Sequence, residues 1–87
     1  TRYPQLFEIL RQKRYQMAQK AHIPPYIIFS DKTLREMSTY LPVSQEEMLE
    51  INGVGNNKYQ KYGKVFSDII KEFMEENHIE KEQSVDL

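Results

Sequence analysis

The sequence contains no cysteine, no tryptophan and only three glycines among its 87 residues. Without cysteine, neither a disulfide bond nor a thiolate-bound metal can stabilise the fold. A chain of this size forms one domain, which can bury only about 60–65% of the surface of the unfolded chain. No apolar run approaches the roughly 18 residues of a membrane-spanning helix, so we expect no membrane partner. The chain starts at Thr1 rather than Met, and we expect it to be a segment of a longer protein.

Residues suited to catalysis or metal binding are also scarce. The two histidines, His22 and His78, have no carboxylate at metal-ligand spacing. The paired glutamates are sequence neighbours, so on a helix they point in different directions and do not converge. No Walker-type phosphate loop is present, because the glycine turn at residues 53–55 is not followed by Gly-Lys-Ser/Thr. We therefore predict no catalytic residue, no metal site and no cofactor for this chain.

Charge is divided unevenly along a chain whose formal net charge is −1. Residues 1–64 contain ten Lys/Arg and six Asp/Glu, a balance of +4, whereas residues 65–87 contain two and seven, a balance of −5. The basic part permits binding to nucleic acid, although strong binders are usually more basic. We expect the acidic end of the chain to compete with nucleic acid for the basic side chains.

Apolar residues recur at helical spacing in most of the chain, so we predict an all-α fold without a sheet. The first helix should end before Pro24-Pro25, because proline disfavours helical geometry in the preceding residue. Ser30 and Ser44 are suitable N-caps for two further helices, and Gly63 should separate the last two. The predicted helices cover residues 4–22, 31–40, 45–51, 56–62 and 64–77.

A short apolar run from Tyr26 to Phe29 has the composition of a strand. Because it is four residues long, stands beside two prolines and has no partner run, we predict an extended loop that places apolar side chains in the core. The folded domain should cover residues 1–77, and the acidic tail, 78–87, should be disordered. The residues expected to be buried are Leu6, Leu10, Leu34, Met37, Leu49, Ile51, Val54, Phe66, Ile69 and Ile70.

The turn at residues 52–55 is the most informative local feature. With the apolar residues before it, the turn follows the apolar-x-x-apolar-x-Gly-apolar-Gly pattern of helix-hairpin-helix elements. Gly53 and Gly55 would let the backbone approach a phosphate, and the next helix would offer free N–H groups at its positive end. Lys58, Lys61 and Lys64 follow at helical spacing on nearly one face. The alternative is that the glycines only allow tight contact between helices, and the local pattern does not decide between the two.

A second basic group lies on the first predicted helix. Arg11 and Arg14 are three residues apart and share a helix face, although an ordinary solvated surface would look the same. Tyr26 follows a rigid Pro-Pro step. If its ring is exposed, it can stack on a nucleobase and contribute about 1–3 kcal/mol. If the ring is buried, it belongs to the core.

In this order, these segments resemble the HRDC domain, the helicase-and-RNase-D C-terminal module of RecQ-type DNA helicases. The resemblance covers roughly residues 4–75, and the run PPYIIFSD together with the NGVG turn favours the bacterial RecQ type over RNase D. Each motif is weak alone, and together they are specific. The matching residues are Leu6-Phe7, Leu10-Arg11, Arg14, 24–31, Thr33-Leu34, Met37, Pro42, Met48-Leu49, 51–55, Lys58, Tyr62-Gly63 and Phe66.

The resemblance implies a small orthogonal bundle of about five helices, related to SAM-like folds. It implies an accessory function in DNA repair and recombination, in which the ATPase lies elsewhere and this module contacts single-stranded or junction DNA weakly. The implied partners are DNA and the helicase core of the same polypeptide, in a monomeric chain in the bacterial cytoplasm at the nucleoid. The residues predicted to bind DNA are Arg11, Arg14, Tyr26, Gly53, Gly55, Lys58 and Lys61.

Two alternative functions remain open from the sequence. One is a protein-interaction module that docks on the helicase core or on another partner. The other is the C-terminal module of an RNase D-type exoribonuclease. An exposed face that combines Tyr26 with basic side chains would favour DNA binding, whereas a contiguous apolar exposed patch would favour the interaction module.

Overall fold

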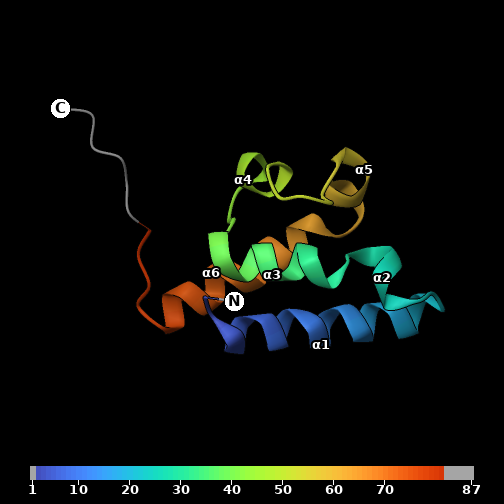
Figure 1. The fold of residues 1–87 in the computed structure, drawn as a ribbon, viewed down its shortest axis with the longest axis horizontal. Helices are drawn as coiled ribbons and strands as arrows, with labels where there is room; N and C mark the ends of the chain where they lie inside the picture. The colour runs from blue at the N-terminus through green and yellow to red at the C-terminus, as the bar shows by residue number, and fades with distance from the viewer. Residues whose placement is uncertain (1, 82–87) are drawn as a thin grey trace.

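The computed structural model describes residues 2–81, and within this range it contains helices and connecting segments but no strand (Figure 1). The prediction of an all-α bundle is therefore confirmed. No helix in the described part is long and apolar enough to cross a membrane. The elements are α1 (Pro4–Ala21), α2 (Pro25–Ile28), α3 (Asp31–Tyr40), α4 (Gln45–Leu49), α5 (Asn56–Lys58), a π-helical segment η1 (Tyr59–Gly63) and α6 (Lys64–Glu76).

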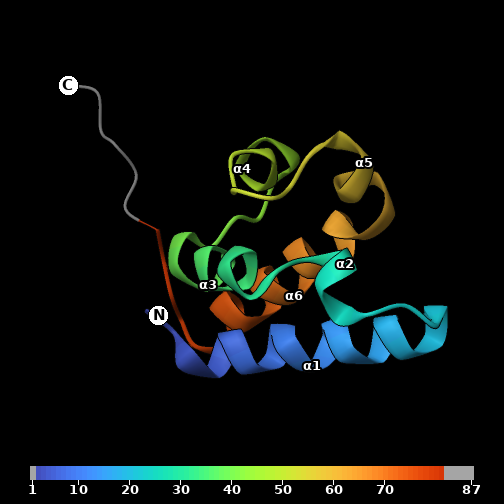
Figure 2. The ribbon, with the colours of Figure 1, turned by 45° about the vertical axis from the view of Figure 1, so that its right-hand side comes forward.

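The helices are arranged in three tiers (Figures 1 and 2). The long helix α1 forms the first tier, α3 and α6 form the second, and the short helices α4 and α5 form the third. In both views α2 and α5 lie at one end of the molecule, together with the C-terminal end of α1. The N-terminus and the end of α6 lie toward the opposite end. The two ends therefore offer separate surfaces.

The core includes residues of all three tiers, because Met48 of α4 is buried in the same cluster as Leu10 of α1 and Phe66 of α6. Its centre is an aromatic pair, Phe29 and Phe66, whose rings meet edge to face with centroids 5.1 Å apart. Full burial of an aliphatic or aromatic side chain contributes about 1.5–3 kcal/mol. The cluster of buried apolar side chains around this pair is therefore the main source of stability in so small a domain. Of the residues predicted to be buried, Leu49 and Ile69 are only half-buried. The others are buried as predicted.

Residues 25–28 form one helical turn, so the prediction of an extended loop there is wrong. Pro25 fits the first turn of a helix, where a missing N–H is not needed, and the Ile27 amide donates to the Pro24 carbonyl at 3.1 Å. An extended segment would bury alternate residues. The helical turn instead exposes Tyr26 and Ile27 together and buries Ile28 with Phe29.

Gly63 does not separate two helices, contrary to the prediction. The chain continues without a break from α5 through η1 into α6. The segment η1 is π-helical, and a π-helical turn is wider than an α-helical turn. A Cβ atom at Gly63 would lie 2.3 Å from Cδ1 of the Tyr59 ring. The glycine is therefore required by contact with this aromatic ring one turn earlier, which the sequence pattern does not show.

The segment that follows α6 folds back over the bundle. The Ile79 amide donates to the Met74 carbonyl at 2.9 Å, and the Ile79 side chain is half-buried. Lys81 Nζ lies 2.7 Å from Glu47 Oε2 at the start of α4. Residues 78–81 of the predicted acidic tail thus contact the bundle, and the rest of that tail, 82–87, lies outside the described residues.

Candidate nucleic-acid interface

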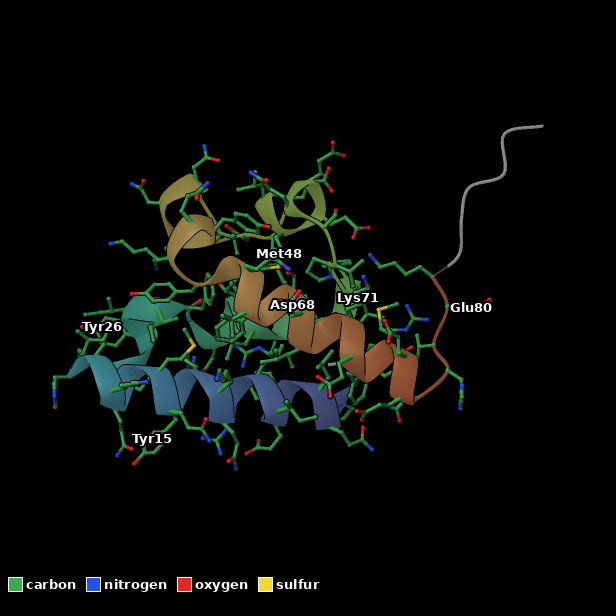
Figure 3. The ribbon with its side chains drawn as sticks, turned by 180° about the vertical axis from the view of Figure 1, so that it is seen from behind. Tyr15, Tyr26, Met48, Asp68, Lys71 and Glu80 are labelled. Carbon is green, nitrogen blue, oxygen red and sulfur yellow. The ribbon has the colours of Figure 1, made fainter. Side chains whose placement is uncertain are left out.

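Tyr26 is an exposed aromatic side chain on a well-anchored element. It is 69% exposed, the largest exposed fraction among the large hydrophobic side chains of the described residues. Behind it, Phe29 is fully buried against Phe66 and also meets the Tyr62 ring, with centroids 6.2 Å apart. Figure 3 shows Tyr26 at the end of the molecule opposite Glu80. The structure therefore decides what the sequence left open: the Tyr26 ring lies on the surface and does not belong to the core.

Arg14, which the sequence suggested as a DNA-binding residue, is buried. It is 8% exposed, its Nη1 donates to the Phe29 carbonyl at 2.9 Å, and its Nη2 lies 2.7 Å from Asp31 Oδ1. Arg14 follows Leu10 by four residues and precedes Ala18 by four, which places it on the buried face of α1. The guanidinium thus joins α1 to the segment between α2 and α3 and is not available for phosphate.

Arg11 is exposed in the middle of α1 and already has an anionic partner. Its Nη2 lies 2.6 Å from Glu8 Oε1, one turn earlier on the same helix. This hydrogen-bonded pair raises the pKa of Arg11 and lowers the pKa of Glu8. DNA would have to compete with Glu8 for this guanidinium, so Arg11 is a weaker candidate than a lysine without an acidic neighbour.

The two glycines of the turn have different backbone requirements. Gly53 has a φ of +95°, which non-glycine residues rarely adopt, and a Cβ there would lie 2.3 Å from Thr33 Oγ1. Gly55 has φ −96° and ψ 178°, and a Cβ there would meet nothing within 4 Å. The structure therefore shows a steric need for glycine at Gly53, and it shows none at Gly55.

Lys58 and Lys61 follow this turn at the same end of the molecule as α2. Lys58 is half-buried, Lys61 is exposed, and neither has an ion-pair partner among residues 2–81. Lys64, the next lysine, pairs with Asp68 at 2.9 Å, which raises the pKa of Lys64. Contact between the Phe29 and Tyr62 rings brings the end of α2 and the segment η1 together. Tyr26 and the two lysines thus belong to neighbouring elements.

Two exposed residues near this surface, Ile27 and Lys32, were not predicted from the sequence. Ile27 is exposed beside Tyr26 because α2 is helical. Lys32 is exposed in the first turn of α3, directly before Thr33, whose side chain contacts the glycine turn. The capping motif at Ser30 predicts the start of α3 and thus places Lys32 in a first helical turn. It does not show that the next residue, Thr33, contacts the glycine turn.

A match to a known family accompanies this geometry. Residues 4–70 match the sequence profile of the HRDC domain. The chain belongs to the HRDC domain family. The resemblance found from the sequence motifs is therefore confirmed. The matched region includes α1 to α5, η1 and half of α6, whereas the end of α6 and the returning segment 77–81 lie beyond it.

Curated relatives of this HRDC domain include bacterial helicases. The chain is 52% identical over 67 residues to the ATP-dependent DNA helicase RecQ of Haemophilus influenzae, covering 77% of this chain. It is 44% identical over 73 residues to the ATP-dependent DNA helicase RecQ of Bacillus subtilis, covering 84% of this chain. A more distant relative, the ATP-dependent DNA helicase UvrD2 of Mycobacterium tuberculosis, is 31% identical over 62 residues. The matched regions span only 11%, 12% and 8% of these relatives.

No cluster of three or more His, Asp or Glu residues that could hold a metal ion occurs within the described range. At the end with α2 and α5, the HRDC domain has an exposed aromatic ring, that of Tyr26, and two lysines, Lys58 and Lys61, that have no ion-pair partner among residues 2–81. This arrangement is suited to binding a flexible polyanion that carries aromatic bases.

Proposed function

We propose that this HRDC domain is an accessory module of a RecQ-type ATP-dependent DNA helicase, and that it binds single-stranded DNA weakly through the surface around Tyr26, Lys58 and Lys61. The observation that carries the proposal is the 69% exposure of Tyr26 on an anchored helical turn, at the same end of the molecule as two unpaired lysines. A ring of this kind stacks on any base, and lysines beside it contact phosphates.

Binding by this surface should be weak. Arg14 is buried and Arg11 is paired, so two or three cations remain, namely Lys58 and Lys61 with Lys32 as the third. Each phosphate contact on a single strand contributes about 0.7 to the slope of log K against log salt, which gives a slope of roughly −1.4 to −2.1. So small an electrostatic contribution corresponds to a dissociation constant on the order of micromolar or weaker at physiological salt.

The names of the relatives support the helicase context. The three relatives described above are all named as ATP-dependent DNA helicases, which favours this context over an RNase D-type exoribonuclease. In such a protein the ATPase would lie in the remaining part of the polypeptide. The domain would help to select the single-stranded or junction DNA that the helicase core engages during repair and recombination in the bacterial cytoplasm.

The proposal is tested by titrating fluorescein-labelled oligothymidine with the domain at low salt and measuring fluorescence anisotropy. Tyr26→Ala should weaken binding by about 1–3 kcal/mol, a factor of roughly 5 to 150, with the salt slope nearly unchanged because stacking releases few ions. Tyr40→Ala is the matched control. Tyr40 is 64% exposed and borders hollows that also include Lys81, away from α2 and α5. Equal effects of the two substitutions, or no binding by the wild type, would overturn the proposal.

One observation favours the second candidate function, docking on a protein surface. A shallow groove of about 560 Å³ lies along α1 beside α6, and its apolar members are Ile9 and Ile69. Ile9 is 44% exposed, and Val65 on α6 is 37% exposed. Exposed aliphatic side chains of this kind suit contact with the helicase core of the same polypeptide. Loss of binding to a separately purified helicase core in Ile9→Glu, with DNA binding retained, would support this function.

A further inference from the structure

The hydroxyl group of Thr33 joins the start of α3 to the glycine turn. Thr33 is 3% exposed, and its Oγ1 donates to the Asn52 carbonyl at 2.8 Å. The same oxygen lies 3.0 Å from Ser30 Oγ, and Ser30 Oγ in turn accepts a hydrogen bond from the Thr33 amide at 3.1 Å. The N-cap of α3 and the turn before α5 are thus connected through one side chain.

The turn approaches α3 closely because Gly53, which has no side chain, faces the Thr33 hydroxyl. A Cβ at Gly53 would lie 2.3 Å from Thr33 Oγ1, so no other residue would let the turn approach α3 so closely. A second hydrogen bond, from the Asn52 amide to Glu36 Oε1 at 3.2 Å, holds the turn to the next turn of α3. The position of the turn is therefore set by the polar face of α3.

The Tyr26 side of the surface is held by different contacts. Arg14 binds the Phe29 carbonyl and Asp31, and the Phe29 ring is buried against Phe66. None of these contacts involves Thr33 or the glycine turn. The start of α3 therefore carries two independent attachments, one to the element that presents Tyr26 and one to the turn that precedes the lysines.

We infer that Thr33 is a positioning residue for DNA binding, and that its hydroxyl fixes where Lys58 and Lys61 lie relative to Tyr26. This inference rests on the proposed function. It adds the contact that keeps the lysines of the DNA-binding surface at a fixed position relative to the Tyr26 ring. The Phe29–Tyr62 contact brings η1 near α2, and the Thr33 hydroxyl fixes the turn from which α5 begins. Thr33 itself touches no DNA.

The substitution Thr33→Val separates the hydroxyl from the shape of the side chain. A methyl group in place of the hydroxyl cannot remain 2.8 Å from the Asn52 carbonyl, because carbon and oxygen atoms normally stay about 3.3 Å or more apart. The turn must therefore shift by about half an ångström and lose a hydrogen bond. The contacts that hold Tyr26 remain. Thr33→Ser keeps the hydroxyl and is the conservative control.

The test is the salt dependence of binding to labelled oligothymidine for the wild type, Thr33→Val, Thr33→Ser and Tyr26→Ala. Thr33→Val should flatten the slope of log K against log salt by about 0.7 for each phosphate that the lysines no longer reach, although the substitution changes no charge. At 0.1 M salt each such phosphate corresponds to about fivefold weaker binding. Thr33→Ser should restore the slope, whereas a purely structural effect of Thr33 on a domain that stays folded would leave the slope unchanged.

Circular dichroism at the titration temperature confirms that each variant is folded. If Thr33→Val unfolds, Thr33→Ala replaces it, since it removes the hydroxyl without a methyl group against the turn and should also flatten the slope. An unchanged slope in the folded variant, or failure of Thr33→Ser to restore it, would overturn the inference. Failure of the proposed function is distinguishable, because the wild type would then bind no DNA or bind it independently of Tyr26.

Discussion

Alanine in place of Gly53 should lower the free energy of unfolding far more than alanine in place of Gly55, two residues later. Gly53 has a φ of +95°, and its missing Cβ would lie 2.3 Å from Thr33 Oγ1. Gly55 has an extended backbone with φ −96°, and no atom lies within 4 Å of its missing Cβ. The two variants therefore differ in backbone strain and in contact, while the added group is identical.

The expected difference follows from these two features. An alanine at positive φ is strained by about 1–2 kcal/mol. The clash also forces Thr33 to rotate, which breaks its hydrogen bond to Asn52 and removes about another 1 kcal/mol. Gly53→Ala should therefore lose about 2–3 kcal/mol of an unfolding free energy on the order of 5 kcal/mol. Gly55→Ala should lose nothing, and it gains about 0.4–1 kcal/mol if the unfolded chain is restricted without native strain.

Thermal unfolding followed by circular dichroism measures both effects. In a domain of this size, 1 kcal/mol corresponds to about 4–8 °C, so Gly53→Ala should melt roughly 10–20 °C below the wild type. Gly55→Ala should melt at the wild-type temperature or a few degrees above it. Equal losses in both variants, or a stable Gly53→Ala, would refute the argument that the turn needs glycine only where φ is positive.

Three further predictions follow from single contacts. Arg14→Met should lower the unfolding free energy in urea by about 1–3 kcal/mol, because the Phe29 carbonyl loses its donor, and wild-type stability would contradict this. The hydrogen bond from Lys81 lowers the pKa of Glu47 below its usual 4.5, so Glu47→Gln should lose less than about 1 kcal/mol at neutral pH. This loss should disappear as the pH falls through the lowered pKa, whereas a difference that persists in acid would have another cause. Gly63→Ala should lose about 1–3 kcal/mol by displacing the Tyr59 ring, and unchanged melting would show that the ring moves freely.

Local signals in the sequence predicted most of the fold. Both serine caps form as expected: Ser30 Oγ accepts from the Thr33 amide, and Ser44 Oγ accepts from the Glu47 amide, each at 3.1 Å. The start of a helix is visible in the sequence because the cap and the groups it satisfies lie within three residues. Helical periodicity likewise predicted the buried faces, because it depends only on spacing along one element.

The errors occur where the same residues suit two conformations. The apolar run at α2 has the composition of a strand, yet Pro25 begins a helical turn there. Gly63 suits a helix end, yet it lies within a continuous helix, where it makes room for the Tyr59 ring. The burial of Arg14 could have been found from its spacing of four from Leu10 and from Ala18, but its charge favoured the surface interpretation. Its partners, a carbonyl and a carboxylate beyond the Pro-Pro step, become visible only in the fold.

The residues predicted to bind DNA do not all lie on one surface, because the sequence does not show which of them the fold buries. The structure brings Tyr26 and the lysines of α5 and η1 to one end of the molecule, and it leaves Arg14 in the interior. The C-terminal end of α6, with its glutamates, and Glu80 lie at the opposite end (Figure 3), so these acidic residues are remote from the lysines. Competition between the acidic end and DNA was inferred from charge along the chain, which carries no information about this distance.

Mapping of chemical shifts tests the central claim most directly. The ¹⁵N-labelled domain is titrated with oligothymidine at low salt, and the amide shifts are followed residue by residue. We predict that the largest shifts occur in α2 around Tyr26, in the turn at residues 52–55, and from Lys58 to Lys61. Largest shifts along the groove at Ile9 and Ile69, or no shifts at millimolar DNA, would contradict the claim that this end of the HRDC domain binds single-stranded DNA.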